Sequence, residues 1–182
     1  MSIILDLVGS VIIAGLLLLM MFNANTYQSN TRFASDSELQ MQQNAKTLAD
    51  ILSYDLRKIG YECKTNPFLV ADSERVSYYA DMNRDGSQDI VTYYVSDTTQ
   101  ASSTPNPKDR VLIRIVNDDT IAGPSLGLTK VKFSYYNDVG TPTSDFNEIR
   151  SVKAELWIES VEPVDKEYLF TYWELTISPR NL

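Results

Sequence analysis

The chain of 182 residues contains no histidine, one cysteine and seven glycines. Without histidine there can be no Ser-His-Asp triad, no Cys-His dyad and no His-ligated metal. A single cysteine excludes an internal disulfide. We interpret Cys63 as a small buried apolar side chain, with a reactive thiol as the alternative. No catalytic constellation can be named from the residues, and we predict that the protein is not an enzyme.

Basic residues and prolines are missing from the first part of the chain. The first Lys or Arg is Arg32, and the first proline is Pro67. A secretory signal peptide has a basic n-region and a small-x-small cleavage site. Here Phe22 is followed by Asn-Ala-Asn-Thr, so the sequence favours a retained apolar helix over a cleaved signal peptide.

Residues 3–22, IILDLVGSVIIAGLLLLMMF, form one apolar run. A helix of this length spans about 30 Å, the thickness of the hydrocarbon core of a bilayer, so we predict a transmembrane helix. Asp6 lies inside the run, where a carboxylate costs at least ~2.5 kcal/mol. Two explanations stay open: Asp6 reaches the membrane interface, or it pairs with the α-amino group of Met1 in a neighbouring copy.

A second helical pattern follows the polar segment 23–31, which contains no Gly or Pro and is either helix or loop. Apolar residues then recur at spacings of three, four and seven up to Gly60, a natural helix stop. We predict an N-terminal helix within residues 1–60, with an amphipathic half at 33–59 that packs on a head. The apolar stripe consists of Ala34, Met41, Ala45, Leu48, Leu52, Leu56 and Ile59.

Residues 61–182 are predicted to form one β-sheet head, which gives an α+β fold with an antiparallel sheet. Segments rich in β-branched and aromatic residues alternate with polar turns. The head carries 19 acidic and 12 basic residues, a net charge of −7, and we expect it to repel nucleic acid. Polar surface loops are expected at 96–108 and 137–147. The predicted strands are 76–80, 90–95, 110–116, 128–136, 149–160 and 168–178.

Oxygen-bearing side chains alternate in the segment DMNRDGSQD at 81–89. Calcium prefers six to eight oxygen ligands, and a tight loop with this spacing can bring several side-chain oxygens together around one ion. The pattern matches the first nine positions of an EF-hand calcium loop. The twelfth place is Thr92 rather than Glu, and strands flank the segment. The alternative is an ion-free hairpin turn. The predicted calcium ligands are Asp81, Asn83, Asp85, Asp89 and the Ser87 carbonyl.

Three further patterns are given structural interpretations. Tyrosine pairs at 78–79, 93–94 and 135–136 are expected to place one ring in the core and one toward water. Asp118-Asp119 is expected on a solvated turn, not in a glycosidase cleft. A small basic patch would form if its strands are neighbours, but it is too small to predict nucleic-acid binding. It contains Lys130, Lys132, Arg150 and Lys153.

The chain resembles type IV pilins, above all the larger minor pilins and the pseudopilins of type II secretion. The resemblance rests on the apolar N-terminal helix with an acid near its start, the string DLRKIGY at 55–61, the β-sheet head and the terminal RNL. It implies a subunit stored in the inner membrane, processed by a prepilin peptidase and polymerised by a motor ATPase into a filament cored by these helices.

The sequence departs from that family in three places. The usual leader that ends in glycine is absent, and the acid is Asp at position 6 rather than Glu at position 5 of the mature chain. Either a leader was cleaved before Met1, or Met1 is an initiator and Ser2 restores the register.

Three functions are compatible with these observations. The first, which we favour, is a structural subunit of a type IV pilus-like extracellular filament, with other subunits as partners. The second is a pseudopilin of a type II secretion system. The third is a monomeric, membrane-anchored, extracytoplasmic calcium-binding domain.

Overall fold

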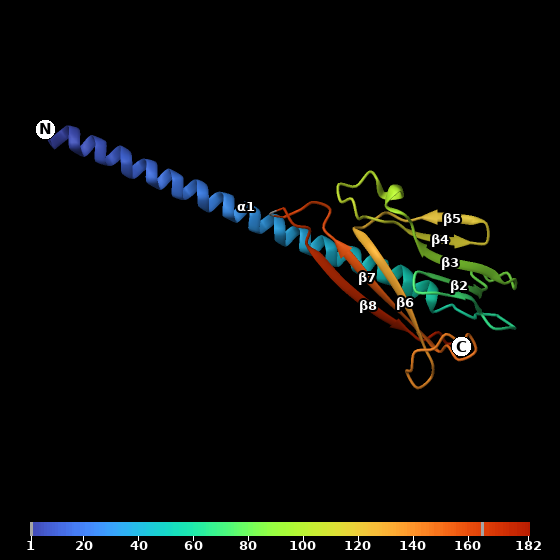
Figure 1. Cartoon of the computed structure of the whole chain (residues 1–182). Coiled ribbons are helices and arrows are strands. Elements are labelled where there is room, and N and C mark those ends of the chain that lie inside the picture. Colours follow the sequence, from blue (N-terminus) through green and yellow to red (C-terminus); the bar gives the residue numbers. More distant parts are fainter. Residues whose placement is uncertain (1, 165) are drawn as a thin grey trace. The chain divides into compact units, whose positions relative to one another are not determined.

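The computed structural model describes residues 2–164 and 166–182. It combines one long helix, α1, with eight antiparallel strands and a short 3₁₀ helix, η1, at Thr98–Ala101 (Figure 1), which confirms the α+β prediction. Helix α1 spans Ser2–Leu56. The strands are β1 Phe68–Ala71, β2 Arg75–Ala80, β3 Asp89–Val95, β4 Leu112–Val116, β5 Asp119–Ala122, β6 Leu128–Tyr136, β7 Ser151–Glu159 and β8 Phe170–Ile177.

The chain divides into two compact units, residues 1–37 and 38–182. The described part of the first unit is entirely helical, including the polar segment 23–31, so the loop alternative for this segment is wrong. The hydroxyls of Thr26 and Thr31 donate to the carbonyls of Phe22 and Tyr27, at 3.0 and 2.9 Å. The hydroxyl groups of these two threonines therefore find their hydrogen-bond acceptors within the helix itself.

Helix α1 ends at Leu56, and a series of turns leads to Gly60, the residue predicted as its stop. Gly60 has a φ of +77°, in the left-handed region that glycine adopts readily. The side-chain amide of Asn181 donates to the carbonyl of Ile59 at 3.3 Å, so the last residues of the chain close the end of the helix.

The prediction that Cys63 is buried is wrong. Cys63 is half-buried, and its thiol contacts the carbonyl of Thr65 at 3.2 Å. It lies in the turns after α1 and not on the apolar stripe, so the packing that buries Ile59 does not extend to it.

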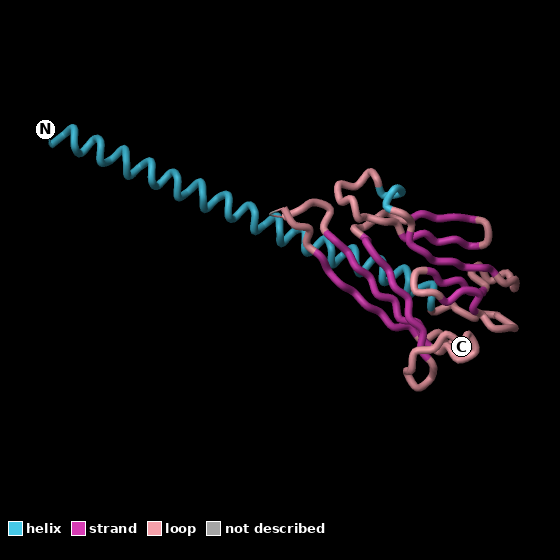
Figure 2. The backbone as a smooth tube through the Cα atoms, viewed as in Figure 1, coloured by secondary structure: helices cyan, strands magenta, loops and turns pink. Residues whose placement is uncertain are grey.

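The strands form two antiparallel sheets where the sequence predicted one (Figure 2). The first has the order β1-β2-β3-β4-β5, and the second has the order β6-β7-β8. Strands β1 and β5 were not predicted. Each has four residues and lies at a sheet edge, too short for an alternating pattern to be recognised. Asp119 therefore begins β5, and the turn is formed by Asn117 and Asp118.

The core of the second unit joins the helix stripe to both sheets. Met41, Ala45, Leu48, Leu52, Leu56 and Ile59 are all buried, as predicted. The prediction was wrong for Ala34, which is only half-buried and belongs to the first unit. They share one hydrophobic cluster with Val76, Tyr78, Val91 and Tyr93 of the first sheet and with Val131, Phe133, Val152, Ala154, Leu156 and Ile158 of the second. Tyr78, Tyr93 and Tyr135 are buried while Tyr79, Tyr94 and Tyr136 are half-buried, which confirms the alternation of the tyrosine pairs.

A buried charge pair links α1 to the first sheet. The carboxylate of Asp55, only 3% exposed, accepts hydrogen bonds from the Tyr93 hydroxyl at 2.6 Å and from Arg114 Nε at 2.5 Å. Burial and the bond to Asp55 raise the pKa of Tyr93 well above its usual value, so this hydroxyl stays a donor. Helix α1 is thereby held to β3 and β4 by polar contacts as well as by packing.

We predict that Asp55→Ala destabilises the protein by about 3 kcal/mol, because it leaves the Arg114 guanidinium and the Tyr93 hydroxyl without their buried acceptor. The measurement is the free energy of unfolding by denaturant titration. Lys108→Ala is the matched control, since Lys108 forms an exposed pair with Glu159 that is worth about 0–1 kcal/mol. Equal losses for the two variants would contradict the structural role of Asp55.

Candidate functional site

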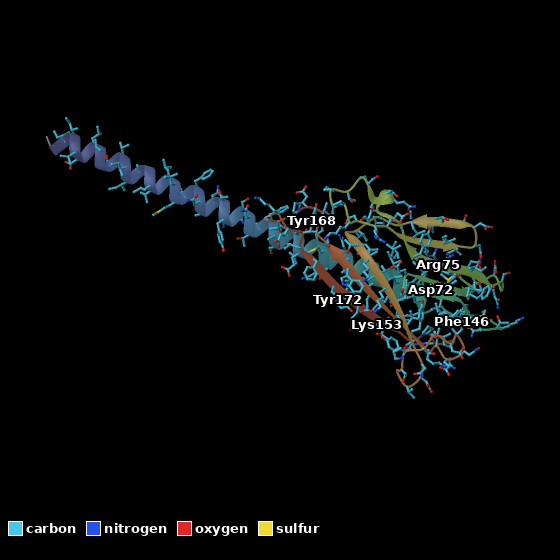
Figure 3. The ribbon with its side chains drawn as sticks, viewed as in Figure 1. Asp72, Arg75, Phe146, Lys153, Tyr168 and Tyr172 are labelled. Atoms are coloured by element: carbon cyan, nitrogen blue, oxygen red, sulfur yellow. The ribbon has the colours of Figure 1, made fainter. Side chains whose placement is uncertain are left out.

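The N-terminal unit presents apolar side chains to every side of its helix. Fifteen large apolar side chains between Ile3 and Phe22 are 52–82% exposed. Figure 3 shows the side chains of this half of α1 standing out around the ribbon. This is the one helix, in the part of the chain that the structure describes, that is long and apolar enough to cross a membrane, and an 18-residue stretch of it has a mean hydropathy of 2.7.

Exposure of this surface to water is costly. Full burial of a side chain such as Leu or Ile is worth about 1.5 kcal/mol or more, so fifteen of them amount to on the order of 20 kcal/mol. This exceeds the net stability of most domains. The helix therefore requires an apolar environment, and its exposure on all faces means that one flat partner surface would not suffice.

Asp6 lies on this apolar helix and is exposed. Among the described residues, Asp6 has no hydrogen bond or salt bridge from its side chain. Met1, the proposed source of the pairing amine, lies outside the described residues. The pairing of Asp6 with Met1 stays a prediction.

The 81–89 segment forms a tight loop between β2 and β3. Asp81, 3% exposed, accepts three backbone N–H bonds, from Arg84 at 2.6 Å, Asp85 at 3.2 Å and Gly86 at 3.0 Å. Asp89 accepts the N–H of Met82 at 2.9 Å. The first and last aspartates of the loop therefore fix its backbone.

The middle of the loop is held by Asn83 and Asp85. The Asn83 side chain accepts the N–H of Asp85 at 3.1 Å and donates to its carboxylate at 2.9 Å. Asp85 also accepts the N–H of Ser87 at 2.7 Å. The bonds from Ser87 and Asn83 lower the pKa of the Asp85 carboxyl, which favours its charged form.

The β4–β5 turn contributes a residue that sequence reasoning missed. Asn117 has a φ of +53°, donates from its side chain to Asp89 at 2.7 Å and accepts the N–H of Ile90 at 2.9 Å. The Asn-Asp dipeptide between two strands is a turn signal, but only the tertiary structure places this turn beside the 81–89 loop. Asn117 thus fixes the end of the loop from a neighbouring hairpin.

The loop leaves both predicted alternatives open. A carboxylate has about four lone-pair sites, and Asp85 and Asp89 each use two of them within the protein, so oxygens remain for a hard cation. The same bonds also suit a turn without an ion. In the described residues, no three Asp, Glu, Cys or His side chains stand ready as a metal group.

Two lysines of the predicted basic patch pair with glutamates on the outer face of β6, β7 and β8. Lys153 pairs with Glu174 at 2.8 Å, and Lys132 lies 3.7 Å from Glu155. The hydroxyl of Tyr172, labelled with Lys153 in Figure 3, lies 2.7 Å from Glu155 and 2.8 Å from Glu174. Lys132 and Lys153 thus have acidic partners. Lys130 instead lies over the Trp157 ring at 4.8 Å, and Arg150 donates to the carbonyls of Asn147 and Ile149.

Comparison of the chain with models of known protein families, with curated proteins and with solved structures finds no match.

We predict that calcium raises the melting temperature of the protein through the 81–89 loop, because the ion offsets the repulsion between Asp81, Asp85 and Asp89. The measurement is a thermal melt with calcium and with chelator. Asp85→Asn should abolish the shift, whereas Asp138→Asn, a change of an exposed aspartate in another loop, should retain it. Identical wild-type melts in the two solutions would favour the ion-free turn.

Proposed function

We propose that the protein is a structural subunit of a type IV pilus-like extracellular filament, assembled by bundling of the N-terminal helices. The observation that carries the proposal is the apolar surface of residues 3–22, exposed around the whole helix. The inner membrane shelters this surface before assembly, and sister helices shelter it afterwards.

The difference in burial between the two halves of α1 supports the proposal. The buried stripe from Met41 to Ile59 belongs to the core of the second unit, whereas the apolar side chains of residues 3–22 are exposed. A helix that is apolar all round needs neighbours all round. Head-to-tail contacts between copies generate an open filament when they do not close into a ring, and this is the arrangement that we propose.

Asp6 has a role in such a bundle. A carboxylate among apolar helices needs a cation, and the nearest basic side chain, Arg32, lies 26 positions on, about 39 Å along a helix. We propose the α-amino group of Met1 in the neighbouring copy as its partner. The charge is then neutralised only on assembly, and the pair sets the register between copies.

Electron microscopy of full-length protein after detergent removal tests the proposal. We expect long filaments of uniform width. Short, stubby assemblies would favour the pseudopilin function. Dispersed single molecules in water would contradict both and leave a membrane-anchored domain.

We predict that Asp6→Ala slows filament assembly by about tenfold or more, which corresponds to 1.4 kcal/mol or more of lost pairing. The reason is that the neighbour's ammonium group is then left unpaired in an apolar core. Asp36→Ala, which removes an exposed carboxylate from the same helix, is the control and should assemble normally. Both variants should melt like the wild type. Assembly of Asp6→Ala at the wild-type rate would exclude the charge pair.

A further inference from the structure

The two sheets end in four edge strands, and two of these edges are protected. Strands β1 and β6 each have a register shift of the β-bulge type. The backbone of β6 is also bonded to the rest of the head: the N–H of Phe133 donates to the carbonyl of Ser73, and the carbonyl of Leu128 accepts the N–H of Arg110, both at 2.7 Å. Bulges and covering contacts of this kind prevent a sheet edge from pairing with another chain.

The other two edge strands, β5 and β8, are open. Each pairs on one side only, β5 with β4 and β8 with β7, in an unbroken register. Beyond these two ladders, no backbone group of 119–122 or 170–177 has a backbone partner among the described residues. Neither strand contains a lysine, a proline or a bulge, which are three devices that protect free edges. An open edge of this kind can accept a further strand.

Both open strands leave an apolar side chain exposed on the core-facing side of their sheet. Ile121 is 53% exposed and lies opposite Arg114, whose side chain reaches Asp55 of α1. Trp173 is 38% exposed and lies opposite Leu156, which is fully buried. Directly opposite residues share one face of a sheet. Each sheet therefore ends in an apolar side chain that its own core does not cover.

The ends of the two strands carry complementary charges. Arg57 and Arg180 line one hollow at the end of β8, and Asp118 and Asp119 lie at the start of β5. All four side chains are exposed, and none of them has a salt bridge in the part of the chain that the structure describes. Glu167 precedes β8, so the two ends of β8 have opposite charges.

We propose that β5 of one copy of the chain adds to β8 of the next copy as an antiparallel strand. Antiparallel pairing places the aspartates at the start of β5 beside Arg57 and Arg180, whereas parallel pairing would place them beside Glu167. Strands β5 and β8 lie at opposite sides of the second unit in Figure 1, so one molecule cannot pair them with each other. The contact is head-to-tail, because the two edges are different, and it can repeat from copy to copy.

The exposed apolar side chains set the register of the pairing. With Ile121 opposite Trp173, both side chains become buried on the core-facing side of the joined sheet, and Thr120 lies opposite Glu174. The inference rests on the proposed filament, because β5 offers only four residues. Such a short contact depends on the bundled helices to hold the two strands at a high local concentration.

Disulfide cross-linking of detergent-free, full-length protein tests the pairing. Thr120→Cys and Glu174→Cys are introduced together in a Cys63→Ser background, because opposite residues of an antiparallel pair have Cα atoms about 4.5–5.5 Å apart, a distance that a disulfide spans. After mild oxidation we expect a ladder of dimers, trimers and larger species on a non-reducing denaturing gel. A mixture of the two single variants should stop at dimers, since each copy then carries one cysteine.

A control and a second pair assign the cross-link to the proposed register. Leu69→Cys, at a 37% exposed position on the protected edge strand β1, replaces Thr120→Cys in the control and should lose the ladder. Ile121→Cys with Trp173→Cys tests the same register and decides if the first double variant fails to fold. A ladder of equal extent in the control would overturn the proposal.

Electron microscopy of the same samples separates this inference from the proposed function. Filaments together with the ladder support both. Filaments that give no ladder with either cysteine pair overturn the strand pairing and leave the filament in place. A ladder without filaments supports the strand pairing and contradicts the proposed function, and the absence of both overturns both.

Discussion

The need to shelter the apolar surface of residues 3–22 constrains the whole molecule. Burial of this surface is worth on the order of 20 kcal/mol, more than the net stability of a typical domain, so no conformation that leaves it in water is competitive. Residues 38–182 have a core of their own, which the buried stripe of α1 and both sheets form together. In the function that we propose, lipid supplies the apolar environment first and other copies of the chain supply it after assembly.

Helix α1 meets two different environments with one unbroken backbone. In residues 38–56 only one stripe is apolar, and that stripe is buried by two sheets and fixed by the bonds of Asp55 to Tyr93 and Arg114. In residues 3–22 every face is apolar apart from Asp6. A compact unit with its own core and an apolar helix exposed on all sides are the two parts that the proposed filament subunit requires.

The sequence predicted the fold best where one periodicity dominates. The helix stripe from Met41 to Ile59 and the alternation of Val152, Ala154, Leu156 and Ile158 both follow from burial of one face. The sequence did not predict the edge strands β1 and β5, which are too short to show an alternating pattern. It also did not predict the division into two sheets, because alternation does not reveal which strands pair. The bonds within the 81–89 loop follow its Asp and Asn spacing, but the contact of Asn117 depends on a distant turn that only the tertiary structure brings close. The loop at 96–108 was predicted to lie on the surface, yet Ser96, Ala101 and Asn106 are buried.

The central claim is that, outside lipid, sister copies shelter the apolar helix. The most direct test places a nitroxide spin label at Ile13→Cys in a Cys63→Ser background and records the paramagnetic resonance spectrum of detergent-free protein. The account predicts strong dipolar broadening that disappears when labelled chains are diluted with unlabelled ones. A sharp spectrum from soluble protein, unchanged by dilution, would contradict it.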